Sequence, residues 1–526
     1  MPEFAHLTFA AWPVLTVLVF LPLAACALLV FVRNEEAVRR VSLAAGLAEV
    51  ALALPLFRFV LGYGGFQFVE LRPWVPAWKL NYALGVDGIS LLLVLLTVLL
   101  LPLCVLCSWS YIKTRVKEFH VCLLLMASAC IGVFVSLDIV LFYVFWEAML
   151  VPMYLLIAVW GGPDKRYASI KFFLYTLAGS TLLLVAIIAM YIKAGTFFIP
   201  DLMLAGFPAG FQNWVFLCMA LAFAIKVPMF PFHTWLPAAH VEAPTAGSVM
   251  LASILLKMGA YGFIRFCLPM TPQASVHFAP LMIGLSLASI LYGGFIALGQ
   301  KDMKKLIAYS SVAHMGFVTL GLFVFNLHGL EGAMMQMINH GITTGALFML
   351  VGCIYERSHS REIMENAGLG KFLPAYVFFF GLFSLSALAY PGTNSFVGEI
   401  LVLIGAFEHR WVYGFLAIPG AMLAAAYMLR LLQKIVWGEP ARGKGWVDLS
   451  LREWLYLSPL AVLVLYLGFA PGLALKIMDP TLGEVVTAFR RKAEIVEIRE
   501  VEQPARAMAG TPQLTDPATE EENGEI

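Results

Sequence analysis

The segment Phe223–Pro237 reads FAIKVPMFPFHTWLP, and it places a cation beside two prolines within an apolar run. Lys226 stands inside the run, and Pro228 and Pro231 interrupt it shortly afterwards. Proline removes a backbone hydrogen bond and clashes with the preceding helical turn. In lipid, the freed backbone groups are tolerated only where protein or water satisfies them. The segment therefore predicts a broken membrane helix that lines a hydrated cavity.

The composition of the whole chain predicts an all-α integral membrane protein. Of its 526 residues, 61% are hydrophobic and only 13% are charged, whereas a soluble domain carries about 25% charged residues. The net charge of +1 gives no reason to expect a nucleic-acid partner. The eight cysteines fall in or at the ends of apolar segments, so we expect neither a disulfide framework nor a metal site.

Apolar runs long enough to cross the membrane divide the chain into transmembrane helices. A span needs about 20 residues to cross about 30 Å of hydrocarbon. We identify fourteen runs, near 12–32, 41–61, 88–110, 119–136, 138–159, 169–192, 211–235, 245–266, 277–298, 305–325, 330–354, 372–407, 411–436 and 454–475.

The segments outside these runs are short except at the C-terminus. Within 1–110, the alternating stretch FQFVELRP predicts a hairpin near 66–83. From 479 to 526 the chain turns polar; it predicts an amphipathic helix over 482–500 and a disordered tail from Glu502.

The distribution of lysine and arginine predicts the orientation of the chain. The odd-numbered loops carry nineteen of these residues and the even-numbered loops carry four. Cytoplasmic loops are the positive ones. We therefore expect a bacterial plasma-membrane protein with both termini on the non-cytoplasmic side.

Six ionisable residues lie inside the expected spans. They are Glu147, Lys226, Lys257, His314, His340 and Glu399. Inserting a charged side chain at the centre of a membrane span costs about 2.5–3.5 kcal/mol. A single carboxylate could simply pair with a lysine and lock two helices, and each histidine could be an ordinary interhelical hydrogen-bonding group. Arg265 and Arg430 stand nearer span ends and are expected to be interface anchors. The six residues together favour a proton relay.

A second break is expected in the twelfth run, where Pro391, Gly392 and Asn394 precede Glu399. Two broken helices with buried charges are typical of transporters built from repeats. We therefore predict two inverted five-helix repeats, helices 4–8 (119–266) and helices 9–13 (277–436), with breaks in helices 7 and 12.

The six residues suggest an order of proton transfer. Burial favours a neutral lysine and a nearby carboxylate favours a charged one. We therefore expect Glu147 to modulate Lys226, Lys257 to relay through His314 and His340, and Glu399 to act as the exit group.

Four segments carry a family resemblance: FYVFWEAMLVPMYLLIAVWGG, KVPMFPFHTWLPAAHVEAPTAGSVMLASILLKMGAYG, KKLIAYSSVAHMGF and PGTNSFVGEI. With NYALGVDGISL, they make the chain similar to the antiporter-like membrane subunits of respiratory complex I, and within them to the M-type subunits of proton-translocating NADH:quinone oxidoreductases. The resemblance assigns the functional positions of helices 5, 7, 8 and 12 to Glu147, Lys226, Lys257 and Glu399. A glutamate rather than a lysine in helix 12 suits the M-type.

The resemblance also implies what other chains supply. NADH, FMN, iron–sulfur clusters and quinone would bind other subunits, so this chain would belong to an enzyme without performing its redox chemistry. Its partners would be neighbouring antiporter-like membrane subunits and the lipid bilayer. Two alternatives stay open: a subunit of a multisubunit cation/proton antiporter or membrane-hydrogenase-type ion pump, and a passive membrane scaffold.

Overall fold

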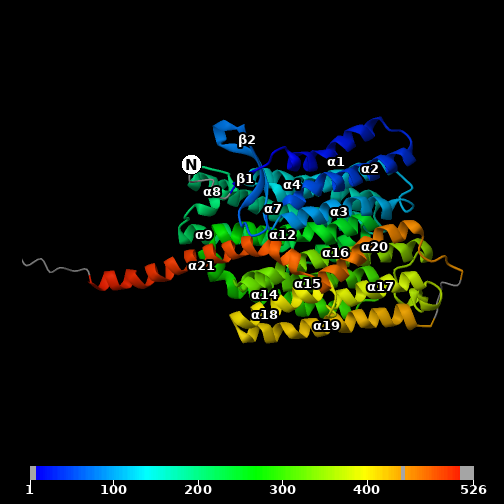
Figure 1. The fold of residues 1–526 in the computed structure, drawn as a ribbon. Helices are drawn as coiled ribbons and strands as arrows, with labels where there is room; N and C mark the ends of the chain where they lie inside the picture. Colours follow the sequence, from blue (N-terminus) through cyan, green and yellow to red (C-terminus); the bar gives the residue numbers. More distant parts are fainter. Residues whose placement is uncertain (1–6, 440–444, 510–526) are drawn as a thin grey trace, which may run out of the picture.

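The computed structural model describes residues 7–439 and 445–509, and these form a stack of long, roughly parallel helices (Figure 1). Within the described residues, thirteen helices are long and apolar enough to cross a membrane. The number is fourteen if the bent pair Met364–Lys371 and Pro374–Ala387 counts as one span. The prediction of an all-α membrane protein with about fourteen spans is therefore confirmed.

The N-terminal half contains helices α1 to α13. Their bounds are α1 Val14–Phe31, α2 Glu35–Ala53, α3 Leu91–Ser108, α4 Val116–Val135, α5 Ile139–Ala148, α6 Leu150–Trp160, α7 Lys165–Ala194, α8 Ile199–Leu204, α9 Ala209–Lys226, α10 Trp235–Glu242, α11 Thr245–Met250, α12 Leu256–Gly262 and α13 Leu268–Met270. Short 3₁₀ helices cover Leu54–Arg58 and Pro76–Trp78.

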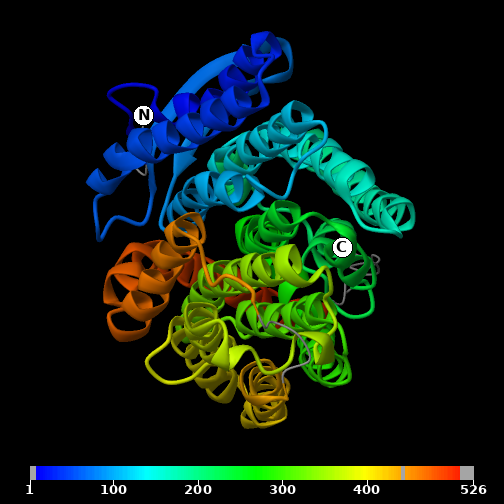
Figure 2. The ribbon, with the colours of Figure 1, turned by 90° about the vertical axis from the view of Figure 1, so that its right-hand side faces the viewer.

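The C-terminal half contains helices α14 to α21. Their bounds are α14 Pro272–Leu298, α15 Met303–Phe323, α16 Leu327–Ser358, α17 Pro374–Ala387, α18 Asn394–His409, α19 Trp411–Trp437, α20 Leu451–Phe469 and α21 Gly472–Ala509. Short 3₁₀ helices cover Met364–Asn366 and Leu369–Lys371. Seen along the bundle, the helices of the two halves form separate groups that meet at the centre (Figure 2).

The centre of the bundle is made by the spans that carry the ionisable residues. The most apolar windows of Thr245–Met270 and Leu327–Ser358 are 100% buried within the protein, and that of α15 is 94% buried. By contrast, only 28% of the Glu35–Arg58 window is buried. Charged side chains on the central spans are therefore enclosed by protein and not by lipid.

Both predicted helix breaks are present. Helix α9 ends at Lys226, and helical structure resumes only at Trp235. The indole of Trp235 donates to the carbonyl of Ile225 at 2.8 Å, and the backbone N–H of Phe230 donates to Ser289 Oγ at 2.8 Å. These bonds satisfy backbone groups that Pro228 and Pro231 leave outside a regular helix.

The second break separates α17 from α18. Here Ala389 and Gly392 have positive φ values of 57° and 92°, a conformation that ends a helix and is easiest for glycine. At the start of α18, Asn394 Oδ1 accepts from Ser386 Oγ at 2.6 Å, and its carbonyl accepts from Asn339 Nδ2 at 2.7 Å. Polar side chains from α16 and α17 thus hold the break in place. The inverted relation of the two five-helix units stays a prediction.

The span Thr245–Met270 is continuous but irregular. Two π-helical turns, Leu251–Leu255 and Phe263–Cys267, flank α12. A π-helical turn widens the helix and leaves a backbone carbonyl without its usual partner, and such turns are frequent at functional sites. Neither turn is predicted by the sequence.

A small sheet caps one end of the bundle. Strands β2 (Phe66–Val75) and β3 (Leu80–Val86) pair in antiparallel register, where the sequence predicts a hairpin near 66–83. Strand β1 (Leu7–Phe9), which the sequence did not predict, pairs with β2 in parallel. The sheet, α8 and the far end of α21 all lie at the same end of the bundle (Figure 1).

The C-terminal helix differs from its prediction. α20 ends at Phe469, and α21 runs from Gly472 to Ala509, beyond the expected helix 482–500 and past the end of the bundle (Figure 1). The expectation of a disordered chain from Glu502 is therefore wrong for residues 502–509. Glutamate, arginine and alanine are strong helix formers, and they extend a helix that its packed first half has already nucleated. Residues 510–526 of the expected tail lie outside the described residues.

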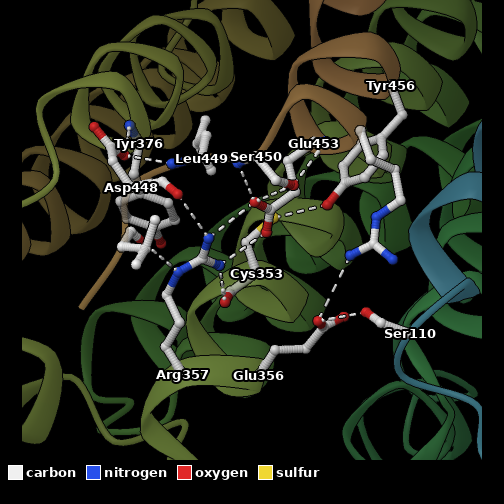
Figure 3. Close-up of polar contacts among 12 residues, drawn as sticks. Ser110, Cys353, Glu356, Arg357, Tyr376, Asp448, Leu449, Ser450, Glu453 and Tyr456 are labelled. Atoms are coloured by element: carbon white, nitrogen blue, oxygen red, sulfur yellow. Dashed lines mark hydrogen bonds and ion pairs between the residues drawn. The ribbon is translucent and has the colours of Figure 1, made fainter.

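A polar cluster fastens the C-terminal end of α16 to the segment before α20 (Figure 3). The guanidinium of Arg357 donates to both carboxylate oxygens of Glu453 at 2.8 Å, and also to the carbonyls of Val447 and Asp448. The carboxylate of Asp448 accepts from the first backbone N–H groups of α17, at Ala375 and Tyr376. This cluster ties α16, α17 and α20 together without using any residue of the expected proton relay.

Candidate functional site

The first polar contact in the centre joins the span of α12 to α16. The ammonium of Lys257 lies 2.6 Å from His340 Nδ1 and 2.5 Å from the carbonyl oxygen of Ala252. Ala252 belongs to the first π-helical turn, so the irregular turn supplies an acceptor that a regular helix would have used internally. Lys257 is fully buried and His340 is 2% exposed. The lysine is thus held by two acceptors and by no carboxylate within hydrogen-bonding distance among the described residues.

The second contact joins α15 to α18. His314 Nδ1 lies 2.9 Å from Glu399 Oε1, and the same oxygen accepts from Gln336 Nε2 at 3.0 Å. On its other side, His314 Nε2 lies 3.3 Å from the hydroxyl of Tyr427. All four side chains are buried. The glutamate therefore has a titratable partner and a fixed amide donor.

The two contacts form one continuous row. The ring centroids of His340 and His314 are 5.9 Å apart. Within the described residues, His340 Nε2 and Glu399 Oε2 have no hydrogen-bond partner. A proton can therefore pass from His340 Nε2 towards His314, and it can leave the row at Glu399 Oε2. The structure thus places four of the six predicted residues in the order Lys257, His340, His314, Glu399.

The remaining two predicted residues lie near each other, Glu147 in α5 and Lys226 at the end of α9. The ammonium of Lys226 lies 3.4 Å from Met149 Sδ and 4.9 Å from the ring centre of Trp146. No carboxylate of the described residues lies within 4.0 Å of it. Glu147 interacts with it electrostatically, and one oxygen of Glu147 has no hydrogen-bond partner among those residues. The alternative of a simple locking ion pair between Glu147 and a lysine therefore does not describe this arrangement.

A kink in the fifth span positions these groups. α5 ends at Ala148 and α6 begins at Leu150, because Pro152 cannot donate the backbone hydrogen bond that would bridge the two helices. Glu147 and Met149 flank the kink.

Sequence reasoning missed one histidine of the centre. His240, in α10 just after the first break, is fully buried and stacks on Phe348 with ring centroids 4.6 Å apart. Neither of its ring nitrogens has a hydrogen-bond partner among the described residues. It interacts electrostatically with Lys257 and with Lys304. Lys304 is a third buried lysine, after Lys226 and Lys257, and its ammonium donates to the carbonyl of Ala243 at 2.6 Å. The pattern HTWLPAAH, which spaces two histidines by two helical turns, could have identified it.

The expectation that Arg265 is an interface anchor is wrong. Its guanidinium forms a two-pronged ion pair with Asp87, with both N–O distances at 2.7 Å, and the two side chains are 3% and 2% exposed. Arg265 also donates to the hydroxyl of Tyr261 at 3.1 Å. Asp87 follows β3, so the pair fastens the end of the sheet to the central span. Arg430, by contrast, is exposed, as an interface anchor would be.

Within residues 7–439 and 445–509, no group of three or more histidine, cysteine or acidic side chains could hold a metal ion. All eight cysteines are free thiols. The lysine, histidine and glutamate side chains of the central row are acid–base groups.

Two family models match the chain. Residues 136–424 match the model described as NADH:quinone oxidoreductase/Mrp antiporter, TM. Residues 19–133 match the model described as NADH-ubiquinone oxidoreductase chain 4, amino terminus. The first match includes all six residues of the predicted relay.

Individual relatives agree with these models. The chain is 46% identical over 495 residues to NADH-quinone oxidoreductase subunit M of Rhodobacter capsulatus, covering 90% of this chain and 96% of the relative. It is 42% identical to the protein of the same name from Rickettsia prowazekii, covering 91% and 99%.

Among solved structures, the fold is similar to a chain of respiratory complex I from Thermus thermophilus. The TM-score is 0.84 and the identity is 33%, with 90% of this chain and 99% of that chain covered. A chain of the Mrp complex from Dietzia sp. aligns with a TM-score of 0.77 at 21% identity, covering 94% and 56%, and at that identity shows the fold alone.

Proposed function

Because this chain belongs to the family of NADH:quinone oxidoreductase and Mrp antiporter membrane subunits, we propose that it is the proton-translocating M-type subunit of an NADH:quinone oxidoreductase. It is an integral membrane protein whose relatives are subunits of an oxidoreductase complex. One observation supports the proposal most directly: Lys257, His340, His314 and Glu399 form a continuous buried row. Ionisable groups inside membrane spans are costly to bury, and where they occur they mark ion pathways and proton relays.

The row can move one proton by successive transfers. The Lys257 ammonium donates to His340 Nδ1 and becomes a neutral amine. The resulting imidazolium releases the proton from Nε2 towards His314, and a bridging water or a ring rotation spans the gap between the rings. His314 accepts at one nitrogen and donates from Nδ1 to Glu399 Oε1, which becomes a neutral carboxyl group.

The first repeat supplies the group that loads the row. Lys226 lies at the first helix break, beside Glu147 and against Met149 and Trp146. A buried lysine retains its proton when a carboxylate is close and releases it when the carboxylate moves away or becomes neutral. We therefore assign Lys226 and Glu147 to proton loading, with His240 between this break and Lys257.

The driving force comes from outside the chain. We propose that quinone reduction in other subunits changes the charge at the ends of the row, and that NADH, FMN, iron–sulfur clusters and quinone bind those subunits. This chain then contributes proton translocation without redox chemistry of its own. Its partners are neighbouring antiporter-like subunits in a bacterial plasma membrane, and both termini lie on the non-cytoplasmic side.

A second candidate is a subunit of a multisubunit cation/proton antiporter. The family model and the Mrp-like fold favour it as an alternative. The higher identity to the oxidoreductase relatives, over almost their whole length, favours the first proposal. A passive scaffold is disfavoured, because apolar residues would hold helices together at lower cost than unpaired buried charges.

The test compares complexes that contain the natural chain with complexes that carry Lys226→Ala. Native gel electrophoresis first checks that the chain migrates with NADH-oxidising activity. Proton uptake driven by NADH is then measured in inverted vesicles, with Lys193→Ala as the control because Lys193 is exposed. We expect Lys226→Ala to lower the protons moved per NADH and the control to leave that ratio unchanged. An assembled Lys226→Ala complex with the natural ratio would overturn the proposal.

A further inference from the structure

A proton that reaches Glu399 must leave the protein, and the inference that follows rests on the proposed function. Beyond Glu399, the structure brings two more carboxyl groups together at the junction of α16 and α21. Glu331 in the second turn of α16 and Asp479 in α21 bring their carboxyl groups within interacting distance of each other. Two carboxylates that lie close together repel, and a proton held between them relieves the repulsion. The junction is therefore a place that can hold a proton and that the relay has not yet used.

Helix packing connects this pair to Glu399. Between α16 and α18 the backbones touch: a methyl group added at Gly332 would lie 2.5 Å from the backbone nitrogen of Val402, and one at Gly405 would lie 2.5 Å from that of Gly329. The two helices thus run side by side from the Gln336–Glu399 contact to the start of α16. Glu331 lies on this shared stretch, about 7.5 Å along the helix axis from Gln336.

Exposure rises along the same stretch. Glu399 is 3% exposed, and Glu331, nearer the start of α16, is 9% exposed. One turn before Glu331, His328 Nδ1 lies 2.9 Å from Glu408 Oε1, and both of these side chains are 47% exposed. His328 also interacts electrostatically with Glu331. Glu399, Glu331 and Glu408 are therefore progressively more exposed from the buried row to the surface.

Three buried oxygens along this route have no hydrogen-bond partner among the described residues: Glu399 Oε2, Gln336 Oε1 and Asp479 Oδ1. Buried polar atoms in proteins are almost always hydrogen-bonded to protein or to ordered water. Unpaired oxygens at both ends of the route and on Gln336 offer the acceptors that a short chain of hydrogen-bonded water requires.

We propose that Glu331 and Asp479 together form the proton-release group of this chain. The Glu399 carboxyl group gives its proton to the bridging water, which passes a proton to the pair. The pair then holds two protons and is neutral. It returns to its singly protonated state when one proton passes to water at the surface beside His328 and Glu408. No bond other than those to the moving proton forms or breaks.

The proposal also gives the start of α21 a role. This helix is fixed to the end of the bundle that carries the sheet, since Thr481 Oγ1 donates to the carbonyl of Gly64 at 3.0 Å and accepts from the backbone N–H of Gly88 at 3.1 Å. Farther along, the ammonium of Lys492 donates to the carbonyls of Met203 and Pro269. Asp479 is thus held in position by contacts on its own helix. The loop 62–87 lies on the side that charge distribution predicts to be non-cytoplasmic, which is the side where release must occur.

The experiment uses the complete complex in proteoliposomes and measures protons moved per NADH oxidised. The variants are Glu331→Gln, Asp479→Asn and both together, with the carboxylate-preserving Glu331→Asp. The matched control is Glu484→Gln, an exposed glutamate on the same helix α21.

We expect the double variant to lose the same fraction of the proton yield as Lys226→Ala. We expect Glu331→Asp to retain most of the yield and the control to retain all of it. In the natural complex, an infrared carbonyl band of a protonated carboxyl group must change during turnover, and this change must be missing in the double variant. A pair with a purely structural role would give no change during turnover.

The outcomes separate this inference from the proposed function. A natural proton yield in the double variant, with a reduced yield in Lys226→Ala, would overturn the release group and leave the function intact. Natural yields in both would overturn the function itself. If the double variant does not assemble, the proton yields of Glu331→Gln and Asp479→Asn test the release group instead. Each of these single variants keeps a hydrogen bond between the two positions. Natural yields in both singles would overturn the release group.

Discussion

Lys257 Nζ lies 2.6 Å from His340 Nδ1, although 83 residues separate them in the sequence. An ammonium group can only donate, so Nδ1 accepts whenever the lysine is charged, and the other ring nitrogen then carries the hydrogen. The contact therefore fixes the tautomer of His340 and aims Nε2 away from the lysine. Because Nε2 has no partner among the described residues, the next acceptor for the proton can approach only there.

Lys257→Met should stop proton transfer through this subunit. Methionine fills a similar volume but leaves His340 without its donor. Positioned acid–base groups contribute about 100-fold or more to proton-transfer rates, and we expect a loss of that order. The measurement compares NADH-driven proton uptake by complexes with the natural chain and by complexes with Lys257→Met. Exposed Lys193→Met is the control.

A double-variant cycle tests whether Lys257 and His340 act as one unit. If they do, Lys257→Met combined with His340→Gln should lower the rate no further than either change alone. Independent, additive losses would contradict a direct transfer between the two side chains.

Glu399→Gln should abolish transfer at the end of the row, because an amide cannot hold the arriving proton. Gln336→Ala should be milder, since Gln336 only positions the carboxylate. Loss of one hydrogen bond to a charged group costs about 1.5–3 kcal/mol, and about 1.4 kcal/mol is tenfold in rate. We therefore expect a loss of about 10- to 150-fold for Gln336→Ala. Its pH profile should also shift, which a loss of packing alone would not cause. Equal losses in the two variants would contradict these separate roles.

Local signals in the sequence predicted a large part of this structure. Prolines placed both breaks, because the missing N–H acts at the proline itself. Apolar runs interrupted by single ionisable residues predicted the six candidate relay residues, because a charge in lipid is expensive wherever its partner lies. Both inferences need only the residues within one span.

Pairings between spans could not be predicted. Arg265 stands near the end of its span, and nothing local shows that it faces Asp87, 178 residues away. The π-helical turn that frees the Ala252 carbonyl follows from packing between helices and not from local propensity. His240 was missed because it lies between the expected spans 211–235 and 245–266, where a histidine does not stand out.

The Asp87–Arg265 pair should be a major determinant of stability. Removing one partner of a buried ion pair leaves an unpaired charge and costs about 3–5 kcal/mol. Asp87→Asn should therefore lower the temperature at which the complex loses activity, and exposed Arg33→Gln should not.

The apolar double replacement Asp87→Leu with Arg265→Met tests the physical reason. Replacing both buried charges is often neutral or stabilising, so this variant should recover much of the loss. If the double replacement were as unstable as Asp87→Asn, the pair would have a role beyond charge neutralisation, such as holding Tyr261.

Arg357 should control the order of the segment before α20. It bonds both oxygens of Glu453 and two backbone carbonyls of that segment (Figure 3). Arg357→Gln removes the guanidinium that bonds both oxygens of Glu453. The carboxylate of Asp448 still accepts from the first backbone N–H groups of α17. Since bonds to charged groups contribute about 1.5–3 kcal/mol each and the arginine is partly exposed, we expect local opening to increase about 10- to 100-fold. Hydrogen exchange of residues 445–450 in the intact complex measures this opening.

Arg452→Gln provides the matched control in the same cluster. Its guanidinium lies 3.8 Å from Glu356, and both side chains are about one-quarter exposed. Ion pairs of this length near the surface contribute about 0–1 kcal/mol, so exchange in 445–450 should hardly change. Equal acceleration in the two variants would show that the segment responds to any loss of charge at this end of α16 and not to the guanidinium of Arg357. Proton yield should stay natural in both assembled variants, because neither arginine touches the row from Lys257 to Glu399.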